Sequence, residues 1–97
     1  MKHIKIDSKE IKDWDSFHNI FAKTFEFPDY YGKNMDAWID CMDELVNEIT
    51  LLDLGDCSEL NIKCPDIVEA ILDCSAFVNY RKLESKETPV LLVSMFT

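Results

Sequence analysis

Two carboxylates one helical turn apart form the first candidate site in this sequence. Asp36 and Asp40 follow an aromatic turn at residues 28–34, and a helix starting there would carry both on one side. Such a pair could serve in acid–base catalysis, bind a hard divalent cation, or contact a cationic partner. It could also be structural, with Asp36 stabilising the helix N-terminus and Asp40 solvated at the surface. Spacing alone leaves these alternatives open.

Local signals predict how this acidic segment folds. Asn34 can cap a helix with its side-chain oxygen, and Gly32 permits a positive φ in the preceding turn. The apolar residues that follow recur at helical spacing and predict one buried face, made of Met35, Trp38, Ile39, Met42, Leu45, Val46 and Ile49. A neighbouring stripe is polar and consists of Asp36, Asp40, Asp43 and Asn47, with Glu44 and Glu48 further round. No lysine or arginine lies between Asn34 and Lys63, which favours a compensating charge outside the chain.

Two adjacent tyrosines precede this helix. Consecutive side chains in a turn rarely point the same way, so we expect one of Tyr30 and Tyr31 to be buried and the other exposed. An exposed tyrosine beside carboxylates suits the centre of a protein–protein interface, because it combines a large apolar area with a polar hydroxyl.

Charge and length restrict the classes of protein. Ten basic and nineteen acidic side chains give a net charge of -9, which disfavours direct nucleic-acid binding and favours a basic protein partner. Solubility is an equally good explanation of the charge from composition alone. The 97 residues, 47% of them hydrophobic, predict a single folded domain over residues 1–97.

The sequence gives no positive signal for catalysis, a metal or a cofactor. Its four cysteines form no C-x-x-C pair, and with only two histidines available we expect buried free thiols. Two glycines cannot build a phosphate-binding loop. The N-terminus has no signal-peptide pattern and no apolar run approaches the ~20 residues of a membrane span, so we expect a cytoplasmic protein without membrane association.

Periodicity predicts three strands around the acidic helix. Residues 3–7 alternate between polar and apolar, and residues 50–54 form a short apolar run stopped by Gly55. Residues 89–96 are almost continuously apolar, which predicts a strand covered on both faces or nearly so.

Two further helices are predicted. An aromatic stripe from Trp14 to Phe25, capped by Asp13 or Asp15, is a packing pattern. Pro65 suits the first position of a helix that runs to about residue 83, whereas residues 57–63 are irregular or form a short helical turn. The order β, α, α, β, α, β predicts an α/β fold with a small parallel sheet packed against helices.

One motif closely resembles the signature of barstar-like proteins, which are cytoplasmic inhibitors of a secreted bacterial ribonuclease. It reads Pro28-Asp29-Tyr30-Tyr31-Gly32-x-Asn34-Met35-Asp36-Ala37-x-x-Asp40-Cys41. The resemblance implies a three-stranded parallel sheet with packed helices and a non-enzymatic immunity or antitoxin-type function. It implies that the acidic helix and the preceding Tyr-Gly loop block the nuclease active site, with Asp40 in place of a substrate phosphate.

The resemblance also implies a contact surface and a partner. The surface comprises Tyr30, Gly32, Asn34, Asp36, Ile39, Asp40, Asp43 and Glu44. Ile39 stands where the family has a tryptophan, and we expect Trp38 to face the core instead. The family's acidic contacts on its last helix have no secure counterpart, because Arg81 and Lys82 occupy that neighbourhood.

The expected partner is a basic cognate ribonuclease, exported or delivered as a toxin. We expect a monomer alone and a heterodimer with the target. The alternative is an acidic protein-binding module on the same fold with a basic partner that is not a nuclease.

Overall fold

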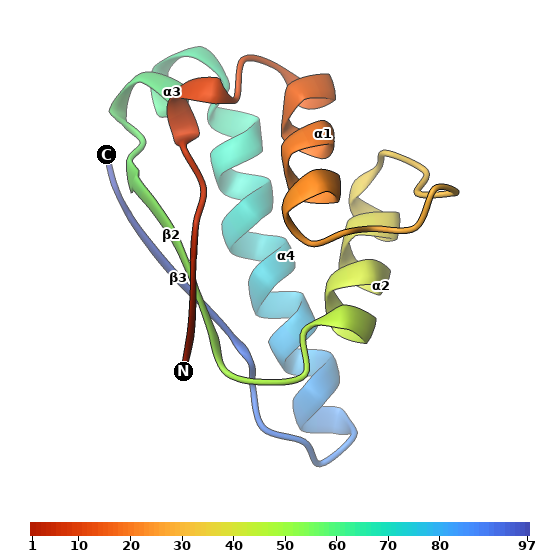
Figure 1. Cartoon of the computed structure of the whole chain (residues 1–97). Coiled ribbons are helices and arrows are strands. Elements are labelled where there is room, and N and C mark those ends of the chain that lie inside the picture. The colour runs from red at the N-terminus through yellow and green to blue at the C-terminus, as the bar shows by residue number, and fades with distance from the viewer.

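The computed structural model describes all residues, Met1–Thr97, and its strands form one parallel sheet (Figure 1). The strands are β1 (Lys2–Lys5), β2 (Thr50–Asp56) and β3 (Leu91–Phe96), in the order β1-β2-β3. Both pairings are parallel. The α/β class and the three-stranded parallel sheet expected from the sequence are confirmed.

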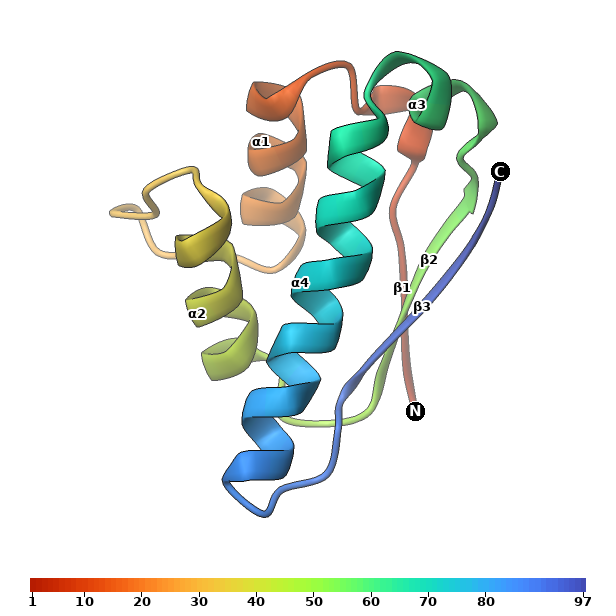
Figure 2. The ribbon, with the colours of Figure 1, turned by 180° about the vertical axis from the view of Figure 1, so that it is seen from behind.

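Helices connect the strands; the three long ones lie together on one side of the sheet, and two short ones lie beyond one end of the strands (Figures 1 and 2). They are the 3-10 helix η1 (Ser8–Glu10) and the α-helices α1 (Trp14–Thr24), α2 (Met35–Leu45), α3 (Ser58–Lys63) and α4 (Pro65–Glu84). In both views α4 stands between the sheet and α2, and it packs against α2 and β3. None of these helices combines the length and the apolar character needed to cross a membrane.

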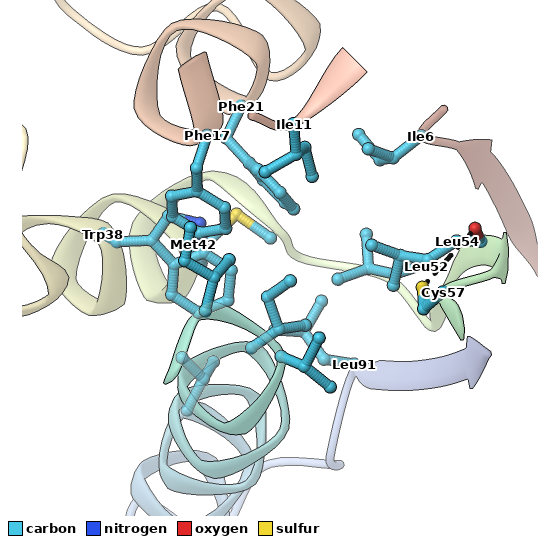
Figure 3. Close-up of a cluster of buried hydrophobic side chains, with 14 of the residues drawn as sticks. Ile6, Ile11, Phe17, Phe21, Trp38, Met42, Leu52, Leu54, Cys57 and Leu91 are labelled. Carbon is cyan, nitrogen blue, oxygen red and sulfur yellow. Dashed lines mark hydrogen bonds between the residues drawn. The ribbon is translucent and has the colours of Figure 1, made fainter. Parts of the chain in front are cut away.

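The core lies between the sheet and the helices (Figure 3). Trp38 and Met42 of α2 are fully buried, and the Trp38 ring meets the Phe21 ring of α1 with their centroids 5.6 Å apart. Leu52 of β2 and Leu91 of β3 complete this cluster from the sheet. Because one face of α2 is fixed in the core, its opposite face must point to solvent.

β3 is covered on one face only, so the prediction of a strand covered on both faces is wrong. Leu91 is buried, whereas Leu92 and Phe96 are 47% and 63% exposed. The long helices α1, α2 and α4 all lie on one side of the sheet, so alternate side chains of β3 point to solvent despite their apolar character.

α2 is shorter than its apolar pattern predicts. The helix ends at Leu45, and Val46 has extended backbone angles, with φ -96° and ψ 101°. Val46 remains buried, but Leu45 and Ile49 are exposed, so the predicted buried face is wrong for these two residues. The chain leaves the helical phase after Leu45 in order to enter β2 at Thr50.

Candidate protein-binding surface

Asn34 begins α2 as predicted, and it also explains the glycine before it. Asn34 Oδ1 accepts a hydrogen bond of 2.8 Å from the Ala37 N–H, and Asn34 Nδ2 donates one of 3.3 Å to the Gly32 carbonyl. The positive φ, 50°, belongs to Lys33, so its expected placement at Gly32 is wrong. A Cβ at Gly32 would lie 3.2 Å from Asn34 Nδ2. Close approach of this amide therefore favours glycine here.

The two tyrosines divide as expected between the interior and the surface. Tyr31 is partly buried, with its hydroxyl 2.5 Å from His18 Nδ1 and its ring against Phe27. Burial raises the pKa of Tyr31, which keeps its hydroxyl protonated. Tyr30 is 85% exposed. The Tyr31 contacts hold the turn in place and leave Tyr30 available to a partner.

The solvent side of α2 carries the carboxylates predicted from the sequence. Asp36, Asp40 and Glu44 are exposed, and Asp43 is partly buried. Trp38 lies in the core, as expected. The apolar residue next to Asp40 is therefore Ile39, which is partly buried.

α4 supplies positive charge to the C-terminal half of α2. Arg81 Nη1 donates a hydrogen bond of 2.9 Å to Asp40 Oδ1, and Arg81 Nε lies 4.0 Å from Asp43 Oδ2. Lys82 Nζ donates a hydrogen bond of 2.8 Å to the Asp43 carbonyl and lies 3.2 Å from its carboxylate. The hydrogen bond to Asp40 raises the pKa of Arg81. Positive charge that compensates the α2 carboxylates thus comes partly from within the chain, because α4 runs beside α2. The sequence alone did not predict this pairing between the two helices.

Asp36, at the other end of α2, makes no ion pair. Burial raises the pKa of Cys74, and the charges of Asp73 and Asp36 raise it further.

The surroundings of Asp36 and Asp40 suit a protein partner better than a small ligand. Neither residue lines any of the five main pockets. His3 contacts Asp53 and His18 contacts Tyr31, so neither histidine is engaged with Asp36 or Asp40. No three His, Cys, Asp or Glu side chains gather as a metal site would require. An exposed acidic helix face is a surface that a larger, cationic molecule can cover.

Comparison with known proteins identifies the family of this chain. The family described as "Barstar (barnase inhibitor)" matches residues 1–93. The chain belongs to the barstar family. A Bacillus subtilis (strain 168) relative described as "Putative ribonuclease inhibitor YrdF" is 38% identical over 42 residues, which cover 43% of this chain and 46% of that relative. The alignment therefore spans about half of the relative's length.

Membership in the barstar family agrees with the parallel sheet and packed helices described above. The family takes its description from inhibition of a ribonuclease, a role in binding and not in catalysis. The exposed acidic face of α2 is therefore a candidate protein-binding surface.

Proposed function

We propose that this protein inhibits a ribonuclease by covering its active site with α2 and the turn before it. The observation that carries the proposal is the exposed acidic face of α2, beside the exposed Tyr30, in a chain of the barstar family. A ribonuclease concentrates cationic side chains where the phosphates of RNA bind. Carboxylates placed among them form charge-assisted hydrogen bonds and exclude the substrate.

Asp40 is the proposed phosphate mimic, and Asp36 is the second acidic contact. Both stand on a helix whose opposite face is anchored by Trp38, so little conformational freedom is lost when a partner binds. Tyr30 provides exposed aromatic area at the edge of this surface. The remaining proposed contacts are Gly32, Asn34, Ile39, Asp43 and Glu44. Asp43 contributes least, since Lys82 already engages it.

Charge also supports this proposal through the rate of encounter. A net charge of -9 attracts a basic nuclease and repels nucleic acid. We propose that the protein acts in the cytoplasm as an immunity or antitoxin-type inhibitor, forming a heterodimer with a nuclease that is exported or delivered as a toxin.

Inhibition of RNA hydrolysis tests the proposal, with barnase and any nuclease captured from the source cell as probes. Asp40→Asn should weaken inhibition by at least about 100-fold, because leaving a buried interfacial cation unpaired costs about 3 to 5 kcal/mol. Glu10→Gln is the matched control: it also removes one negative charge, but from an exposed residue on η1 that makes no ion pair.

Glu10→Gln should change inhibition by less than about twofold, as expected for an exposed charge outside an interface. Equal inhibition by wild type and Asp40→Asn would remove Asp40 from the mechanism. Capture of a basic protein without nuclease activity, with no inhibition of either probe, would replace the proposal with the non-nuclease alternative.

A further inference from the structure

Arg81 occupies one side of the carboxylate that we assign to the nuclease. Its Nη1 donates a hydrogen bond of 2.9 Å to Asp40 Oδ1. The side chains of Arg81 and Asp40 are 39% and 69% exposed, so this ion pair lies at the surface. A cation of the chain itself therefore stands beside the proposed phosphate mimic before any partner arrives.

A ribonuclease would bring further cations to the same carboxylate. An arginine at Asp40 uses one of its acceptor sites and repels an incoming guanidinium or ammonium group, most strongly where water is excluded. We propose that Arg81 competes with the nuclease for Asp40 and must turn away before Asp40 is fully engaged. This inference rests on the proposed function and adds a specificity-determining residue to it.

The structure gives Arg81 a second acceptor. Its Nε already lies 4.0 Å from Asp43 Oδ2, so the side chain can exchange Asp40 for Asp43 by a small rotation and keep a carboxylate partner. Lys82 does not have this freedom, because its side chain is only 8% exposed and its Nζ is bonded to the Asp43 carbonyl. Arg81 is therefore the exchangeable cation of the two.

Competition of this kind selects among partners. A nuclease with a dense cationic site displaces Arg81 and gains Asp40, whereas a weakly cationic protein surface does not. Only a partner whose cations bind Asp40 more strongly than Arg81 does can therefore use this carboxylate.

Arg81→Gln tests the inference, with Lys63→Gln as its matched control. Each variant removes one positive charge from an exposed ion pair, and the Lys63–Glu59 pair lies within α3, which is remote from α2 in Figures 1 and 2. Binding to the inhibited ribonuclease is measured for both at the same ionic strength. Arg81→Gln should bind about two- to fivefold more tightly than Lys63→Gln, the range expected for releasing one exposed ion pair. Equal or weaker binding by Arg81→Gln would overturn the competition.

The same measurement in an Asp40→Asn background separates this inference from the proposed function. If Arg81 acts through Asp40, the gain from Arg81→Gln disappears in that background. A gain that persists would overturn the inference while leaving ribonuclease inhibition in place. If wild type and Arg81→Gln both fail to inhibit any ribonuclease, the proposed function fails and the inference fails with it.

Discussion

The two ends of α2 are stabilised by different parts of the molecule. At the N-terminal end, Asn34 caps the helix from within the same segment, and Asp36 makes no ion pair. In the C-terminal half, Asp40 and Asp43 are paired with residues of α4, which are far away in the sequence. The N-terminal carboxylate is free to accept a partner's cation, whereas the later ones can do so only by exchange.

The helix dipole explains this difference. Asp36 lies in the first turn, where a negative charge gains about 0.3 to 1 kcal/mol from the aligned peptide groups. Asp43 lies near the last turn, where the same field is unfavourable to a carboxylate and where α2 has no basic residue of its own. Lys82 replaces that missing charge and also satisfies a terminal carbonyl of the helix. The C-terminal end of α2 therefore depends on the positive charge of α4, whereas the N-terminal end, which Asn34 caps, does not.

Lys82→Met should give the largest change in stability and tests the dependence on α4. The substitution keeps an apolar stem in a site that is almost fully buried, but leaves the Asp43 carbonyl without its donor and the Asp43 carboxylate without its nearer cation. We expect the free energy of unfolding in urea to fall by about 1 to 3 kcal/mol.

Lys63→Met is the control for Lys82→Met, because it removes an exposed ion-paired lysine instead. It should change the free energy of unfolding by less than about 0.5 to 1 kcal/mol. Equal losses for the two variants would mean that the end of α2 does not depend on burial of Lys82.

Asn34→Ala should give a smaller change and tests the locally stabilised end. It removes the side-chain acceptor of the Ala37 N–H and should lower the free energy of unfolding by about 1 kcal/mol. Asn34→Asp keeps an acceptor oxygen at this position and should retain most of the stability, as judged by urea unfolding. A loss from Asn34→Asp as large as that from Asn34→Ala would show that the cap is not the reason for Asn34.

The locally determined end is also the part of the candidate site that the sequence predicts best. An asparagine before an amphipathic stretch identifies a helix start, and the spacing of Trp38 and Met42 identifies the buried face. The positions of the strands can be predicted equally well, because period-2 alternation and short apolar runs depend only on neighbouring residues in the sequence. These features need no knowledge of distant contacts.

Features that depend on contacts between distant parts of the chain could not be predicted from such local patterns. The contacts of Arg81 and Lys82 with α2 join residues 41 and 39 positions apart, and they depend on how α4 lies along α2. The exposure of Leu45 follows from where the chain must leave the helix to reach β2. The open face of β3 depends on which side of the sheet the helices occupy.

The pH dependence of stability should show the smallest effect, and it again concerns the N-terminal end. His18 is buried against Tyr31, and burial lowers the pKa of His18 from its ordinary value of 6.5, with Lys33 lowering it further. Folding therefore favours the neutral imidazole, so the unfolded chain takes up a proton first as the pH falls. The free energy of unfolding should be fully retained above pH 6.5 and should decrease below it, until the folded protein is protonated as well.

His18→Gln should remove this decrease, whereas His3→Gln should not, because His3 is exposed on β1. The carboxylates cannot produce the same step. Asp13, Asp53 and Asp56 have pKa values lowered from 3.8, each mainly by hydrogen bonds, so their contribution to stability is lost only in more acidic solution.

Because Tyr31 holds the turn that presents Tyr30, protonation of His18 should loosen this end of the surface while the Asp40–Arg81 pair at the other end persists. Side-chain NMR of both regions between pH 7 and 5 would detect the difference, and simultaneous loss of both contacts would show that the two ends of α2 respond as one unit.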